Sequence, residues 1–140
     1  MTTSIDSNVI IALWWDSHSA NRMAARMLNE AQKRGNLIMA APVYAELIAD
    51  PRRSEGELDE FALETGISID WKIDENIWRE AGRAYRSYAM RRVCSGGNPP
   101  RRILADFIIG AHAMIRGYSL LTLNKIDLAT AFPKLTIVSD

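Results

Sequence analysis

The sequence predicts an α/β fold, in which a mostly parallel sheet carries helices on both faces. Short apolar runs alternate along the chain with longer segments of helical periodicity, which is the pattern typical of such a sheet. Of the 140 residues, 48% are apolar and 24% are charged, so the composition is that of a globular protein. This length suits one ordinary domain, and we expect residues 1–140 to form a single domain.

The first half of the chain reads as two strands, each followed by helices. Gly35 lies where a glycine is expected just after a helix, and Pro42 suits the first position of the next one. The expected elements are a strand around residues 4–5, helices over 9–15 and 21–34, a strand at 37–40 and a helix from 42 to 48.

The second half carries clear start and stop signals. Ser54 and Glu57 have the spacing of a capping box, Gly66 and Gly117 each end a helix, and Asp74 or Glu75 opens a long one. The expected elements are a helix from 54 to about 64, a strand at 67–69, a helix to about 93, a loop over 94–100, a helix over 105–116, and strands at 119–122 and 136–138.

Charge and cysteine content limit the classes of function. Basic and acidic residues balance at 17 each, so an RNA contact needs a local basic patch. The single cysteine, Cys94, has no zinc-type cluster around it, and no signal peptide or membrane-spanning run is visible, so we expect a cytoplasmic protein. Three arginine pairs are normally solvated surface: 52–53, 91–92 and 101–102.

Polar residues follow the expected strands at the edge where parallel sheets bind ligands. Asp6, with Ser7 and Asn8 behind it, comes directly after the first strand, and Asn124 and Asp127 follow a late one. Each has a structural alternative, because Asp, Ser and Asn are favoured residues at a helix N-cap.

Two further acids stand alone in apolar segments. Glu46 is expected near the first turn of its helix, where the helix dipole favours a carboxylate. Asp106 lies in a helix that is apolar nearly all round, and a buried carboxylate is costly unless it is paired, protonated or bound to a metal. The alternative for Asp106 is an N-cap at the start of that helix. If the acids converge, they raise one another's pKa and form an oxygen-only site suited to Mg²⁺ or Mn²⁺.

Several segments, taken in order, resemble the PIN-domain family, and within it the VapC-type toxins of bacterial toxin–antitoxin pairs. The strongest likeness is the run around Asp106, and the matches span almost the whole chain. The segments are residues 5–13, 41–47, 102–113, 120–127 and 132–137.

The resemblance implies a PIN-like three-layer domain with a five-stranded, mostly parallel sheet. It implies a Mg²⁺- or Mn²⁺-dependent endoribonuclease that forms homodimers and is neutralised by a cognate VapB-like antitoxin, within a larger toxin–antitoxin assembly. By this resemblance Asp6, Glu46 and Asp106 correspond to the three acids shared most widely in the family, and Ser7 and Asn8 support them.

The fourth site position departs from many relatives. Asn124 stands where many carry an acid, while others have Asn there and an acid three residues on, which here is Asp127. The fourth ligand and the presence of a second ion therefore stay open. Arg101 and Arg102, close in sequence to Asp106, are candidates for contact with RNA phosphates.

A catalytically silent PIN-like module that only binds proteins is the alternative function, favoured by Asn124 and the neutral net charge. His112 lies six residues after Asp106, faces another side of the helix and is interpreted as a packing or surface residue. A dimer or antitoxin surface and ordinary core packing are both open for Trp14, Trp15, Tyr85 and Tyr88.

Overall fold

A computed structural model describes residues 1–96 and 103–138 of the chain. Five strands form one sheet in the order β3-β2-β1-β4-β5, and every neighbouring pair is parallel. The predicted α/β fold class is therefore confirmed. The strands are β1 (Thr2–Ile5), β2 (Asn36–Ala40), β3 (Ile67–Asp70), β4 (Ser119–Leu121) and β5 (Ile137–Val138).

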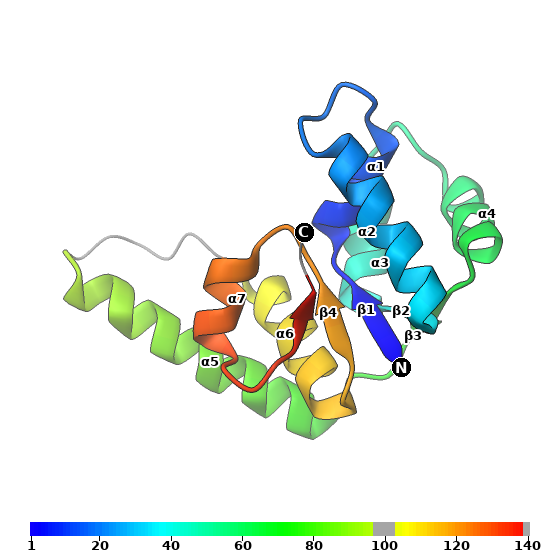
Figure 1. The fold of residues 1–140 in the computed structure, drawn as a ribbon. Coiled ribbons are helices and arrows are strands. Elements are labelled where there is room, and N and C mark those ends of the chain that lie inside the picture. The colour runs from blue at the N-terminus through cyan, green and yellow to red at the C-terminus, as the bar shows by residue number, and fades with distance from the viewer. Residues whose placement is uncertain (97–102, 139–140) are drawn as a thin grey trace.

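Helices cover both faces of the sheet (Figure 1). Helices α1, α2 and α4 lie on one side, while α5, α6 and α7 pack together on the other, and the far end of α5 projects beyond the sheet. The helices are α1 (Ser7–Trp14), α2 (Asn21–Arg34), α3 (Ala41–Ile48), α4 (Glu55–Thr65), α5 (Glu75–Cys94), α6 (Leu104–Arg116) and α7 (Lys125–Ala131).

The strand order places a topological switch point at the middle of the sheet. From β1 the chain moves outward through β2 to β3, then returns to the other side of β1 as β4. Since parallel connections are right-handed, this reversal sends the helices to opposite faces and opens a crevice beyond the carboxyl ends of β1 and β4. Asp6 directly follows β1, and Asn124 lies three residues after β4.

The central strand is buried along most of its length. Ile5, Met39, Leu120 and Leu121 are fully inaccessible to solvent and form the middle of the core. A sheet covered on both faces needs such continuous apolar runs, which explains why the strands lack strict alternation of polar and apolar residues. The carboxyl ends of the strands are thereby fixed as a rigid edge.

The capping box and the helix-ending glycines in the sequence predicted the helix ends well. The capping box of Ser54 and Glu57 is present, and Gly66 and Gly117 both adopt the left-handed conformation, each with φ of 73°. Other boundaries differ by one or two residues: α1 begins at Ser7, β3 extends to Asp70, and β4 and β5 are shorter than expected. Such offsets are usual where helix and strand ends fray.

Gly110 provides a sharp test of the core on the α6 side. A Cβ built on Gly110 meets the ring of Phe132, which is 1% exposed and cannot move aside easily. We expect Gly110→Ala to lower the free energy of unfolding by about 1–2 kcal/mol, because overpacking outweighs the roughly 1 kcal/mol that alanine gains in a helix.

The matched control is Gly82→Ala in α5, where nothing lies within 4 Å of the added Cβ. This variant should raise the free energy of unfolding by up to about 1 kcal/mol, since only the helix preference acts. Urea denaturation of both variants measures the two shifts, and a stabilising Gly110→Ala would contradict the packing described here.

In the two described stretches of the chain, no helix is both long enough and apolar enough to span a bilayer.

Candidate functional site

Asp6 is held at the carboxyl end of the central strand by backbone and side-chain contacts. Its amide donates to the Leu121 carbonyl at 2.9 Å, which ties the end of β1 to the end of β4. One carboxylate oxygen accepts from the Ser7 amide at 2.8 Å, so Asp6 is also the N-cap of α1. The residue is only 4% exposed. The capping interpretation is thus confirmed, and it is compatible with a second role.

Thr122 is a positioning residue that the sequence interpretation missed. Its hydroxyl is fully buried and donates to the second carboxylate oxygen of Asp6 at 2.8 Å. The same hydroxyl oxygen accepts from the Asn8 side chain at 3.3 Å and from the Asn124 amide at 3.0 Å. The available signal was a threonine directly after an apolar strand, at the edge where ligands bind.

Asn8 links the start of α1 to the segment after β4. Its side-chain oxygen accepts from the Leu123 amide at 3.2 Å, while its nitrogen donates to Thr122. The oxygen and the nitrogen of this amide therefore both hold residues 122–124 beside Asp6. Asn8 would support the site through these two hydrogen bonds.

Glu46 approaches the same place from α3. The Ser7 hydroxyl donates to the Glu46 carboxylate at 3.0 Å and joins α1 to α3. Glu46 is the sixth residue of a helix that begins at Ala41, so it lies in the second turn and not near the first, as the sequence interpretation assumed. Since the helix dipole acts mainly within the first turn, it does not explain why a carboxylate stands here.

Asp106 lies in the first turn of α6, on the face of the sheet opposite α1 (Figure 1). The N-cap of that helix is Ile103, so the N-cap interpretation of Asp106 is wrong. The expectation of a fully buried side chain is also wrong, because Asp106 is half-buried while residues 107–113 behind it are buried. The apolar stretch that suggested burial therefore begins one residue after the acid.

The three acids act on one another electrostatically. Burial raises the pKa of Asp6 above its ordinary value of 3.8, the Thr122 hydroxyl opposes this, and the charge of Asp106 adds to the increase. Burial also raises the pKa of Glu46, with further increases from Asp6 and Asp106. The carboxylates of Asp6, before α1, of Glu46 in α3 and of Asp106 in α6 thus repel one another, and a bound cation would offset this repulsion.

Asn124 and Asp127 lie beside Asp106 around a small hollow. Its volume of about 10 Å³ is near the lower limit for one water molecule. Asn124 occupies the N-cap position of α7 without a side-chain capping bond, and Asp127 lies in the first turn and is exposed. The hollow is lined by Tyr88, Asp106, Phe107, Asn124, Asp127 and Leu128.

The donor chemistry of these residues fits a hard divalent cation bound partly through water. Within residues 1–96 and 103–138, no three His, Cys, Asp or Glu side chains are arranged to hold a metal ion directly. Mg²⁺ dehydrates reluctantly and is usually held by one or two carboxylates and several waters, so a closed cage is not required.

Other residues singled out in the sequence lie elsewhere. Arg101 and Arg102 fall outside the described residues. His112 is fully buried and shares a hydrogen bond with Asp70 at 2.8 Å. It is therefore a packing residue and not a neighbour of the three site acids. Tyr85 stacks on Phe107, with ring centroids 4.8 Å apart, and belongs to the core.

The fold and the acidic edge at its switch point together define a PIN domain. The model of the PIN domain family matches residues 4–132, and the chain therefore belongs to this family. A search of curated proteins found no match to the sequence.

Solved structures with the same fold cover nearly the whole chain. VapBC-1 from nontypeable Haemophilus influenzae has 20% identity and a TM-score of 0.69, over 99% of this chain and 98% of that chain. A toxin–antitoxin complex from Klebsiella pneumoniae has 20% identity and a TM-score of 0.64, over 98% and 96%. VapBC2 from Rickettsia felis, bound to a DNA fragment from their promoter, has 19% identity and a TM-score of 0.60, over 99% and 98%. At these identities the likeness shows a shared fold.

Proposed function

We propose that this protein is a Mg²⁺- or Mn²⁺-dependent endoribonuclease toxin of the VapC type. The observation that carries the proposal is the electrostatic interaction of Asp6, at the end of β1, with Glu46 of α3 and Asp106 of α6 at the switch point of the sheet. Burial is the largest cause of the raised pKa values of Asp6 and Glu46, and the charges of the neighbouring acids add to it. Sites that perturb several carboxylates in one crevice are commonly functional.

The residues have distinct roles in this proposal. Asp6 and Asp106 bind the metal directly, and Glu46 binds or orients it through water. Asp127 or Asn124, on the rim of the adjoining hollow, helps to place a second ion or the attacking water. A bound divalent ion would supply an activated water and stabilise negative charge on the phosphoryl group. Thr122, Ser7 and Asn8 fix the carboxylates, and Arg101 and Arg102 are proposed to contact RNA phosphates.

Metal-dependent cleavage tests the proposal directly. Purified protein should cut single-stranded RNA in Mg²⁺ or Mn²⁺ and stop when EDTA is added. Asp106→Asn should lower the cleavage rate by about a thousandfold, because metal-ion catalysis supplies several kcal/mol of transition-state stabilisation. Asp16→Asn, which alters an exposed acid outside the site, is the matched control and should leave the rate unchanged. Full activity of Asp106→Asn would refute the assignment.

A silent protein-binding module remains the second candidate. Two observations favour it: Asn124 replaces an acid found in many relatives, and no group of three ligating side chains is preformed in the described part of the chain. Calorimetric titration with Mn²⁺ separates the candidates. If the protein is a silent module, the Mn²⁺ titrations of wild type and Asp6→Asn should be the same.

We also propose a cognate antitoxin and a homodimer as partners. Support for the antitoxin comes from the solved neighbours, which include a toxin–antitoxin complex and VapBC pairs. Support for the dimer comes from apolar side chains left exposed at the end of α5 and the start of α6. These side chains are Met90, Val93, Ile103 and Leu104, which are between 44% and 65% exposed.

A further inference from the structure

A groove beside the acidic site combines tryptophan and arginine side chains. It lies between the end of α1 and the segment that follows α3, with a volume of about 180 Å³. We call it the tryptophan–arginine groove, and it is lined by Ile11, Trp14, Trp15, Asp50, Arg52 and Arg53.

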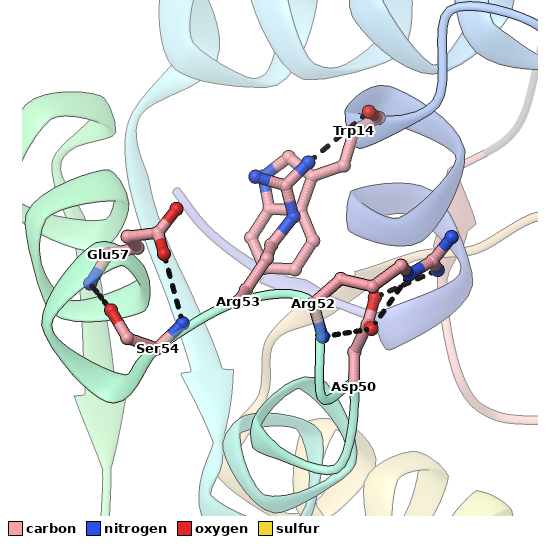
Figure 2. Close-up of polar contacts among 6 residues, drawn as sticks. All are labelled: Trp14, Asp50, Arg52, Arg53, Ser54 and Glu57. Atoms are coloured by element: carbon pink, nitrogen blue, oxygen red, sulfur yellow. Dashed lines mark hydrogen bonds and ion pairs between the residues drawn. The ribbon is translucent and has the colours of Figure 1, made fainter.

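The two arginines are ordered on the indole rings rather than free in solvent. The guanidinium carbon of Arg52 lies 4.2 Å from the centre of the Trp15 ring, and that of Arg53 lies 4.3 Å from the centre of the Trp14 ring. Figure 2 shows Arg53 over Trp14, with a hydrogen bond of 3.3 Å to the Trp14 carbonyl. This pair of arginines, which sequence alone places on ordinary solvated surface, forms two stacked platforms.

Arg52 is oriented by an acid at the base of the groove. Its Nε and Nη2 atoms each donate to Asp50 at 2.9 Å, as drawn in Figure 2. The Arg52 side chain is still 56% exposed, and Trp15 is 44% exposed. A planar guanidinium and an indole are thus presented together to solvent in a fixed geometry.

The groove continues directly from the acidic site. The hydrogen bond between Ser7 and Glu46 joins α1 to α3. Ile11 follows Ser7 by four residues, so the near end of the groove lies about one helical turn, roughly 5.4 Å, further along α1. Trp15, the residue after α1, follows Ser7 by eight residues and lies roughly 12 Å along the same helix. A polymer whose backbone reaches the carboxylates can therefore pass Ile11 and reach Trp15 with a unit further along its chain.

The surrounding charge favours one side of the platforms. The stack of Trp14 and Arg53 also lines a second hollow, together with Glu57, Glu60, Phe61 and Glu64 of α4. These acids repel a phosphate backbone, whereas Arg52 and Trp15 offer a cation and a stacking face. Aromatic rings and guanidinium planes are what single-stranded nucleic acids use for binding, because every base can stack.

We propose that the tryptophan–arginine groove is a nucleotide subsite for single-stranded RNA. An unpaired base close to the cleaved bond stacks on the Trp15–Arg52 platform, and Arg52 contacts a flanking phosphate. The position of the cleaved bond rests on the proposed ribonuclease function. Binding in the groove can be measured without cleavage.

Anisotropy of labelled single-stranded RNA in EDTA tests the subsite on the intact protein. Trp15→Ala should weaken binding by about tenfold, the loss expected for one stacked base, while Trp15→Phe should restore part of it. Trp78→Ala on α5 is the matched control, since Trp78 is similarly exposed at 49%, and should bind as wild type. Unchanged affinity of Trp15→Ala would overturn the proposal.

A scan with single abasic nucleotides identifies the stacked base. One abasic position should weaken binding to the wild-type protein but cause no further loss with Trp15→Ala. Arg52→Gln should reduce the slope of log affinity against log salt by about one, and Arg53→Gln should reduce it less, because Arg53 lies beside the acids of α4. Thermal melts confirm that every variant is folded.

The outcomes separate this subsite from the proposed function. Wild-type cleavage of RNA combined with unchanged binding in Trp15→Ala overturns the subsite alone. Base-dependent binding through Trp15 without metal-dependent cleavage supports the subsite and refutes the ribonuclease. If Trp15→Ala keeps its RNA affinity but loses a co-purified partner protein, the groove is a protein-docking surface, and the subsite is wrong.

Discussion

Asp6→Asn should lower RNA cleavage by about a thousandfold while leaving the metal-free protein as stable as wild type, or more stable. Asn retains a side-chain oxygen for the Ser7 amide and so preserves the N-cap of α1. It removes a buried negative charge that faces Asp106, and this gain offsets the loss of the hydrogen bond that Thr122 donates to the second carboxylate oxygen. Loss of activity with gain of stability is typical of a functional site.

The stability difference should depend on pH in a defined direction. The pKa of Asp6 is raised by burial, so between its ordinary value of 3.8 and the folded value the folded state binds more protons than the unfolded state. Wild-type stability contributed by this group therefore falls as pH rises through that window, and the penalty is complete above it. Asp6→Asn lacks this titration, so its advantage should grow from about pH 4 towards neutrality.

Denaturant melts at several pH values, with and without Mn²⁺, measure this effect. Mn²⁺ should stabilise the wild-type protein, because a ligand that binds the folded state adds stability by mass action. The difference in free energy of unfolding between Asp6→Asn and wild type should therefore become smaller. A variant that loses activity because it has unfolded, with a lower free energy of unfolding at neutral pH, would show a structural role for Asp6 only.

Asp70→Ala should cost about 2 kcal/mol of stability, although Asp70 lies at the sheet edge away from the candidate site. Asp70 is the partner of the fully buried His112, whose other ring nitrogen has no hydrogen-bond partner within the described ranges. Removing the carboxylate leaves a buried imidazole unsatisfied. RNA cleavage by folded protein should be unchanged.

The contribution of Asp70 should disappear in acid. Burial raises the pKa of this carboxyl, but hydrogen bonds from His112 and the Lys72 amide, with the nearby charge of Arg116, outweigh burial and lower it overall. A depressed folded pKa gives stability that is present above the unfolded value of 3.8 and lost as pH falls through the folded value. The gap between wild type and Asp70→Ala should therefore close below about pH 4.

Asp74→Ala is the control for this pair. Asp74 contacts the same Arg116, at 3.2 Å, but its side chain is 56% exposed. Exposed ion pairs contribute only about 0–1 kcal/mol, so this variant should be close to wild type at every pH. Equal losses of stability in Asp70→Ala and Asp74→Ala would show that Asp70 stabilises the fold through Arg116 and not through His112.

Local signals in the sequence were enough to predict the fold class and most helix ends. Gly66, Gly117 and the capping box act within a few residues, so their effect can be read without knowing the tertiary structure. The position of Asp6 after the first strand was predictable for the same reason. Parallel topology then brings strand ends to one edge without further information.

Contacts between distant segments were not predictable from pattern. Thr122 pairs with Asp6, and Asp70 with His112, across 116 and 42 residues, and nothing local marks either pair. The hydrogen bond between Ser7 and Glu46 also joins residues 39 positions apart. The stacks of Arg52 on Trp15 and Arg53 on Trp14 likewise join residues that lie far apart in sequence.

The central position of β1 also has a consequence for the order of assembly. β1 is the first strand in the chain, yet one of its two neighbours is β4, which begins at Ser119. The hydroxyl that orients Asp6 belongs to Thr122, so nearly the whole chain must be in place before that carboxylate has its partners. Contacts of such long sequence separation slow folding. During synthesis, a ribosome-bound chain that has not yet extruded β4 would carry Asp6 without the Thr122 hydroxyl that orients it, so under the proposed ribonuclease function it would not cut the RNA around it.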